Sequence, residues 1–152
     1  MLSRQTFLRT TLVAGIATLA LAGCGQMRPS QKIQIFEASL SAAQEVPPAV
    51  SSATGAAEVQ FNENTNRVTW KVTYSGLTGA ATGAHIHGPA PVGQNAGIVI
   101  PFSGNLNAQP LSGEATLTPA QYADMAAGLY YVNIHSARFP GGEIRGQLRR
   151  RM

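Results

Sequence analysis

The segment at positions 67–75 has the sequence Arg67-Val68-Thr69-Trp70-Lys71-Val72-Thr73-Tyr74-Ser75. Its large apolar residues stand at every second position and alternate with charged or hydroxyl side chains. Because successive side chains of an extended chain point to opposite faces, this period of two places one face in a core and the other toward solvent. The pattern predicts a half-buried β-strand, and residues 63–66 before it (Glu-Asn-Thr-Asn) predict a hairpin turn.

Similar short segments, rich in Val, Ile, Thr and aromatic residues, recur along the chain between clusters of Gly, Pro, Asn and Ser. This spacing is typical of an all-β sandwich or barrel. The eight predicted strands span residues 32–40, 55–62, 67–75, 83–88, 98–102, 111–118, 129–136 and 142–149. At this length the chain can bury an ordinary core, so we expect one all-β domain.

One short helix is expected within this all-β pattern. Thr118 is a suitable N-cap, Pro119 suits the first helical position, and Gln121 completes a capping box with Thr118. Gly128 supplies a stop signal. The expected helix covers residues 119–127.

The first 23 residues have the pattern of an export signal. Residues 1–9 carry two positive charges and no acid, and residues 10–22 are uncharged and mostly apolar, as in the two parts of a secretory leader. The apolar run is shorter than the about 20 residues that span a bilayer, which argues against a transmembrane anchor. It ends at Leu21-Ala22-Gly23-Cys24, which resembles the lipobox of bacterial lipoproteins.

The lipobox resemblance implies that Cys24 carries a lipid and becomes the first residue of the mature chain. We then expect a signal peptide over residues 1–23, a lipidated tether over 24–31 and the folded domain over 32–152. The protein would be held to a membrane of the cell envelope, facing the periplasm or the cell exterior. Cys24 is the sole cysteine of the sequence, so a lipidated chain keeps no thiol for a disulfide or a nucleophile.

The positive charge of the chain is concentrated near its ends. Arg4 and Arg9 lie in the leader and residues 149–151 are three arginines, whereas the remaining sequence is slightly acidic. A short basic tail without interleaved aromatic residues is more typical of a solvated end than of a nucleic-acid site, so we expect no nucleic-acid partner. The sequence also has no P-loop and no G-x-S-x-G motif, which argues against nucleotide and hydrolase chemistry.

The three histidines of the sequence are His85, His87 and His135. The first two lie two positions apart in a predicted strand, so their rings project from one face, about 7 Å apart at the backbone. Two rings at this spacing can converge on one metal ion, whose bonds to nitrogen are about 2 Å long. His135 ends another predicted strand and completes a three-nitrogen site if the two strands are neighbours. The alternative is that the histidines only form local hydrogen bonds.

Five stretches of the chain form an ordered set of motifs. They are Leu40-Ser41-Ala42-Ala43-Gln44-Glu45-Val46-Pro47-Pro48, Gly76-Leu77-Thr78, Ala84-His85-Ile86-His87-Gly88-Pro89-Ala90, Asn133-Ile134-His135-Ser136 and Pro140-Gly141-Gly142-Glu143-Ile144-Arg145-Gly146-Gln147-Leu148. Together they resemble the CHRD domain family, which is named after chordin. The resemblance extends over about residues 36–148, nearly the whole of the expected mature chain.

The same landmarks are similar, more distantly, to Cu/Zn superoxide dismutase. In that family a Gly-Leu-Thr turn precedes a strand with a His-x-His copper pair, and a late strand ends in a further copper histidine. The similarity implies a Greek-key, Ig-like sandwich of about eight strands, with His85, His87 and His135 brought together as copper ligands. Residues 88–101 contain no His or Asp, so the bridging histidine and the zinc loop have no counterpart, and the disulfide and the Arg that guides superoxide are also missing.

The leading expectation is therefore an envelope lipoprotein that binds copper, with zinc less favoured, and that sequesters the ion or hands it on. Glu45 could be a fourth ligand or a second-shell partner of the site, although a loop carboxylate before two prolines is more often solvated or bonded to local amides. Glu143 and Arg145, two apart on one strand, are expected to form a structural ion pair. Two other functions remain open: an adhesion module that holds an envelope protein or glycan without a metal, and a copper-only oxidoreductase.

Overall fold

The computed structural model describes residues 32–152. The expected signal peptide, the lipidation site Cys24 and the tether lie outside the described residues, so those expectations stay predictions. Within the described part of the chain, no helix has the length and the apolar character needed to cross a bilayer.

The described chain is built almost entirely of strands, as the alternating pattern predicted. The strands are β1 (Ile33–Ser41), β2 (Thr54–Asn62), β3 (Arg67–Ser75), β4 (Ala81–His87), β5 (Ile98–Pro101), β6 (Leu111–Thr116), β7 (Tyr131–Ser136), β8 (Ile144–Gln147) and β9 (Arg149–Arg150). A 3₁₀ turn, η1 (Ala42–Gln44), follows β1. The predicted last strand is divided into β8 and β9 at Leu148, whose side chain is fully buried.

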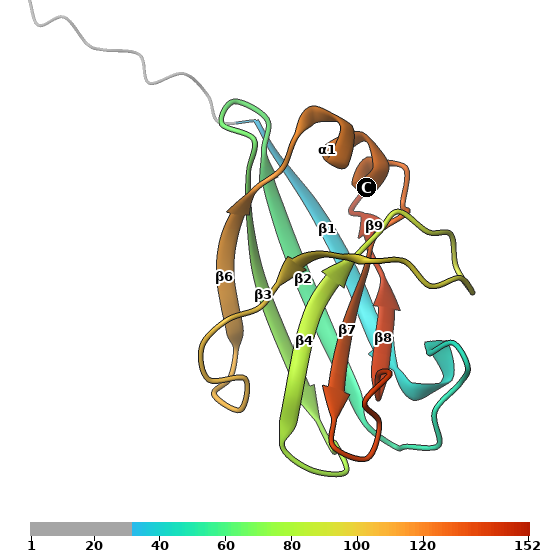
Figure 1. Ribbon diagram of the computed structural model, residues 1–152. Helices are drawn as coiled ribbons and strands as arrows, with labels where there is room; N and C mark the ends of the chain where they lie inside the picture. The colour runs from blue at the N-terminus through green and yellow to red at the C-terminus, as the bar shows by residue number, and fades with distance from the viewer. Residues whose placement is uncertain (1–31) are drawn as a thin grey trace, which may run out of the picture.

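The strands form one antiparallel sheet in the order β5-β4-β7-β8-β1-β2-β3-β6, and β9 also pairs with β1. The chain leaves β6, passes through α1 (Pro119–Ala126) and returns to place β7 beside β4. This long return is the Greek-key connection that was expected. Figure 1 shows β1, β2 and β3 lying behind β4, β7 and β8, so that the sheet curves into a sandwich.

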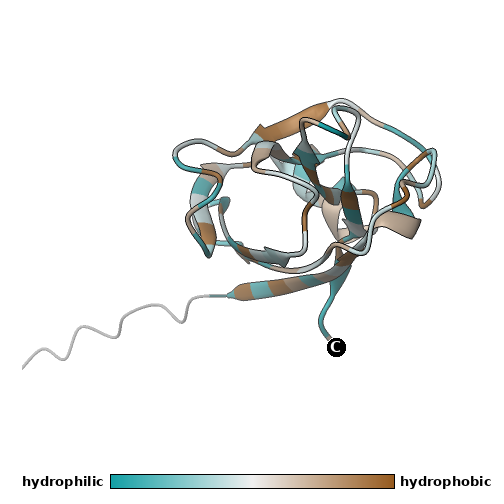
Figure 2. Cartoon of the chain, turned by 90° about the horizontal axis from the view of Figure 1, so that it is seen from below, coloured by the Kyte–Doolittle hydropathy of each residue, from teal (hydrophilic) through white to brown (hydrophobic). Residues whose placement is uncertain are grey.

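The core lies between these two halves of the sheet. Phe36, Val59, Val68 and Ile86 are fully buried, and their strand neighbours point the other way. Figure 2 shows the resulting alternation of brown and teal along β1, the strand that follows the grey trace. The period of two seen in the sequence is thus the alternation between core and surface.

The helix and the first hairpin turn have the predicted local structure. The side chain of Thr118 accepts a hydrogen bond from the backbone of Gln121, and the side chain of Gln121 accepts one from the backbone of Thr118. Gly128 adopts a φ of 76° just beyond the helix, a conformation that glycine takes without strain. Residues 63–66 form the turn between β2 and β3, in which Asn62 pairs with Arg67.

Candidate metal centre

The two histidine strands, β4 and β7, are adjacent and antiparallel, which confirms the expected pairing. In their register His85 lies opposite Asn133, and His135 lies opposite Gly83. Because directly opposed residues share one face of a sheet, the three histidines all project from the same side. The alternate residues of both strands, such as Ile86 and Ile134, are fully buried in the core. The histidines therefore occupy the outer face of the sheet.

The three imidazole rings form one cluster. One ring nitrogen of each residue lies within 4.8 Å of the others, and each residue is half-buried. The nitrogen Nδ1 of His85 is 3.1 Å from Nε2 of His135. Two nitrogens on opposite sides of one ion, each bonded at about 2 Å, are about 4 Å apart. Only a small inward movement of the rings is therefore needed for all three to reach one ion.

Two backbone carbonyls fix which ring nitrogens are free. His87 donates a hydrogen bond from Nδ1 to the carbonyl of Ala96 at 3.1 Å, and His135 donates one from Nδ1 to the carbonyl of Pro140 at 2.9 Å. A carbonyl only accepts, so in the neutral rings both Nε2 atoms keep a lone pair. Nε2 of His87 is buried and has no hydrogen-bond partner among the described residues. An orphaned buried nitrogen of this kind is suited to a metal bond.

The surroundings favour the neutral forms of His85 and His87. Burial lowers the pKa of His85 to about 4, with help from the neighbouring His135 and His87. Burial also lowers the pKa of His87, in spite of its hydrogen bond to Ala96. Because a metal competes with protons for the ring nitrogens, neutral rings are the form that binds it.

Gly83 makes room for the cluster. A Cβ atom at this position would lie 3.1 Å from Cε1 of His85 and 3.4 Å from Cδ2 of His135. Because Gly83 has no side chain, the rings of His85 and His135 can approach each other beside it.

Tyr131 stacks against His87, and Arg145 packs against Tyr131. The ring of Tyr131 lies parallel to the imidazole of His87, with centroids 4.9 Å apart and an interplanar angle of 1°. The guanidinium of Arg145 lies 3.3 Å from the centroid of the Tyr131 ring. The Tyr131 hydroxyl accepts a hydrogen bond from the backbone N–H of Ala96 at 3.1 Å. Ala96, whose carbonyl holds His87, is thereby tied to β7.

Arg145 also holds the loop that contains Ala96. It donates hydrogen bonds to the carbonyl of Gln94 at 2.7 Å and to Oδ1 of Asn95 at 3.0 Å. The loop of residues 88–97 is therefore fastened to β8 as well as to β7.

The expected ion pair between Glu143 and Arg145 is wrong. Glu143 instead accepts hydrogen bonds from Ser51 Oγ at 2.7 Å, from the backbone of Thr78 at 2.8 Å and from Thr78 Oγ1 at 3.0 Å. Burial raises the pKa of Glu143, but hydrogen bonds from Ser136, Ser51 and Thr78 outweigh it and hold the pKa below its usual value. Glu143 and Arg145 therefore form hydrogen bonds with different loops.

Glu45 is not solvated, and it is not a member of the histidine cluster. Its side chain is 5 % exposed, and Oε1 accepts a hydrogen bond from Nδ2 of Asn133 at 2.6 Å. Burial raises the pKa of Glu45 to about 7, against the lowering effect of Arg145 and of Asn133. Glu45 touches Asn133, which lies opposite His85 in the register. Any influence of Glu45 on His85 would therefore pass through Asn133.

From the sequence, no role in the site was assigned to Tyr131, to Asn133 or to the carbonyl of Ala96. Asn133 and Tyr131 lie two and four positions before His135, so the alternation of β7 places all three on one face. That signal was available in the sequence. Nothing in the sequence marks residue 96, because the position of a loop carbonyl depends on tertiary contacts.

The fold and the cluster together define an all-β Greek-key domain with a three-histidine centre on its outer face. Residues 36–148 match the CHRD domain family, so the chain belongs to that family. Searches of curated proteins and of solved structures return no match.

Proposed function

We propose that this protein binds a copper ion through His85, His87 and His135. The observation that carries the proposal is the convergence of three imidazoles, with a buried Nε2 on His87 that has no partner among the described residues. Metal-bound histidines usually donate their other ring N–H to a carbonyl or carboxylate, as His87 and His135 do here. Nδ1 of His85 faces Nε2 of His135 and donates to it in the metal-free protein, so His85 would bind the ion through Nδ1 once that proton is displaced.

A set of three imidazoles suits copper or zinc, and we propose copper. Three imidazoles with a position left for water suit tetragonal Cu(II), and copper binds nitrogen sites more tightly than zinc does. The described residues place no carboxylate in the cluster. We therefore propose one ion per domain.

The proposed role is to sequester copper at the cell envelope or to hand it on. It rests on the export and lipobox pattern that ends at Cys24. A lipid on Cys24 would keep the domain at a membrane surface, where an exchanging copper site meets incoming ions or partner proteins.

Titration of the purified protein with Cu(II), followed by paramagnetic resonance, tests the proposal. We expect one equivalent to bind with a nitrogen-rich signal, and we expect His85→Ala, His87→Ala and His135→Ala each to abolish that signal. Thr82→Ala, an exposed neighbour on β4, is the matched control and keeps the signal. An unchanged signal in His85→Ala would rule the site out, and would favour the adhesion module.

The same copper-loaded protein distinguishes storage from turnover. Each histidine of the cluster is partly exposed, so a small molecule can approach the ion. If the protein only stores or transfers copper, superoxide decays no faster with it than with an equal amount of free copper. A faster decay would identify a copper-only oxidoreductase.

A further inference from the structure

A second candidate site lies next to the histidine cluster but does not include it. An open pocket of about 400 Å³ is lined by residues of two loops and of β8. Val46 and Pro48 come from the loop after β1, Val92 comes from the loop after β4, and Arg145 comes from β8. The two loops are joined by a hydrogen bond from Nδ2 of Asn95 to the carbonyl of Val46 at 2.9 Å. The volume falls in the range of small-molecule sites.

The buried charge of Arg145 is not neutralised by an ion pair. The residue is 2 % exposed, and the hydrogen bonds of its guanidinium go to a carbonyl and an amide oxygen. The ion pairs of the described residues involve Arg67 and Arg151 instead. Buried charges are ordinarily paired, because removing a charge from water is costly. A guanidinium on a cavity wall without a paired carboxylate is thus suited to an anionic ligand.

Glu45, the acidic residue on the cavity wall, is a poor counter-ion for Arg145. It lines the same cavity, but its Oε1 is engaged by Asn133 and no ion pair joins it to Arg145. Burial also raises the pKa of Glu45 to about 7, so a substantial fraction of this group is uncharged at neutral pH. The cavity therefore retains positive charge.

We propose that this cavity binds a small organic carboxylate, with its anionic group at the guanidinium of Arg145. The apolar part of the ligand lies against Val46, Pro48 and Val92. A single cation matches a single carboxylate, and an apolar wall favours an apolar body over a free inorganic anion. The ring of Tyr131 separates Arg145 from His87, so binding requires no metal and stands apart from the copper proposal.

Calorimetry and chemical-shift mapping of the purified, chelator-treated protein test this site. The probes are benzoate and hexanoate, and the uncharged controls are benzamide and hexanamide, which have nearly the same shapes. We expect the carboxylates to bind, with shifts at residues 43–48 and 92–95, and we expect the amides to bind at least about tenfold more weakly. Equal binding of acid and amide, or no shift at these residues up to about 10 mM carboxylate, would overturn the proposal.

A pair of surface substitutions tests the location without disturbing the fold. Val92 lines the cavity and is 65 % exposed, whereas Val50 is 88 % exposed and does not line it. Val92→Asp adds a negative charge at the cavity and should weaken benzoate binding about tenfold, because like charges at this range repel strongly. Val50→Asp makes the same change elsewhere and should leave binding unaltered. Equal effects of the two variants would contradict this location.

A third variant asks whether the guanidinium itself is needed. Arg145→Gln keeps a polar side chain and removes the charge, so benzoate binding should be lost while the folded spectrum remains. Benzoate binding that persists in the folded variant would overturn the proposal. If the variant does not fold, the comparison of the carboxylates with their amides tests the need for charge, and the Val92 and Val50 pair tests the location.

Discussion

At the scale of single residues, Gly83 tests how closely the rings must approach. A methyl group on this residue would press on His85 and His135 at 3.1 and 3.4 Å. We expect Gly83→Ala to weaken copper binding by about tenfold while the domain stays folded, as changes around metal ligands commonly do. Gly79→Ala is the matched control, because a Cβ there meets nothing within 4 Å. Equal copper affinities in the two variants would show that the rings are not tightly placed.

Some features of the site could be predicted from single residues in the sequence, and others could not. The spacing of His85 and His87 predicted their shared face, because the side chains of a strand alternate. The place of His135 depended on a strand pairing between residues 50 positions apart in sequence, which no local pattern encodes. Glu143 was assigned the wrong partner for the same reason, since Ser51 and Thr78 reach it only after folding.

At the scale of elements, Glu143 joins three segments. It links the start of β8 to the connection after β3 and to the loop before β2. Glu143→Gln should lower the free energy of unfolding by about 1.5–3 kcal/mol, because charge-assisted hydrogen bonds to a buried group are lost. Urea denaturation measures this. Glu114→Gln is the control, since its ion pair with Arg67 is exposed and should contribute about 0–1 kcal/mol.

The effect of Glu143 has a defined pH dependence. Its pKa is lowered in the folded state, so its contribution is present above the unfolded pKa and is lost as the pH falls through the folded value. The stability difference between the protein and Glu143→Gln should therefore shrink in acid. A difference that grows in acid would contradict this assignment.

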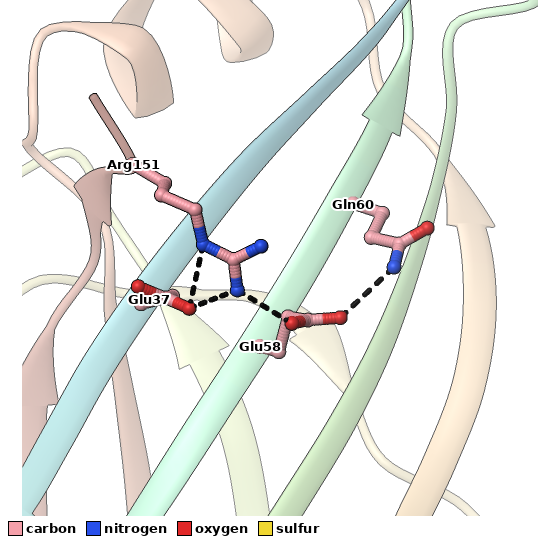
Figure 3. Close-up of polar contacts among 4 residues, drawn as sticks. All are labelled: Glu37, Glu58, Gln60 and Arg151. Carbon is pink, nitrogen blue, oxygen red and sulfur yellow. Dashed lines mark hydrogen bonds and ion pairs between the residues drawn. The ribbon is translucent and has the colours of Figure 1, made fainter.

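The C-terminal segment has exposed arginines, and one of them, Arg151, forms a surface ion-pair network. Figure 3 shows Arg151 between Glu37 of β1 and Glu58 of β2. The backbone of Arg151 also donates to the carbonyl of Ile35 at 2.8 Å. We expect Arg151→Ala to speed amide hydrogen exchange in residues 149–151 and to leave the core strands unchanged. Arg150→Ala, which is outside this network, should have a much smaller effect on exchange.

Most elements were predictable because their signals are local. The alternation of residues 67–75 and the capping box of Thr118 and Gln121 each depend on a few neighbouring residues, and both are observed. The division between β8 and β9 was not predicted, since it depends on the burial of Leu148 and on its backbone bond to Tyr130.

At the scale of the whole molecule, the buried Glu45 and the half-buried His85 have opposite effects on the pH dependence of stability. His85 has a folded pKa of about 4, below the 6.5 of an unfolded histidine, so stability is lost as the pH falls below about 6.5. Glu45 has a folded pKa of about 7, above 4.5, so stability is lost as the pH rises from 4.5 to about 7. Between these limits the two effects partly cancel in the metal-free protein.

Glu45→Gln separates the two effects. It removes the ionisation of Glu45 and keeps an oxygen that can accept from Asn133. We expect the variant to gain stability relative to the protein as the pH rises from about 4.5 to 7, and to show a steeper loss below about 6.5. Urea denaturation across this range measures both. A stability difference that does not change with pH would contradict the burial argument for Glu45.

The overall topology was expected from resemblance, whereas the supporting loops were not. The distant similarity to Cu/Zn superoxide dismutase implied a Greek-key sandwich with neighbouring histidine strands, and the pairing of β4 with β7 agrees with that expectation. The fold of residues 88–97 over His87 depends on Arg145 and Tyr131, which meet it from other strands. These contacts form only when the sheet brings β7 and β8 next to residues 88–97, so no local sequence pattern predicts them.

The most direct test of the central claim is a crystal structure of the copper-loaded protein with anomalous diffraction at the copper edge. The account predicts one strong peak at about 2.0–2.1 Å from a ring nitrogen of each of His85, His87 and His135. A peak bound elsewhere, or no peak among the three rings, would contradict it.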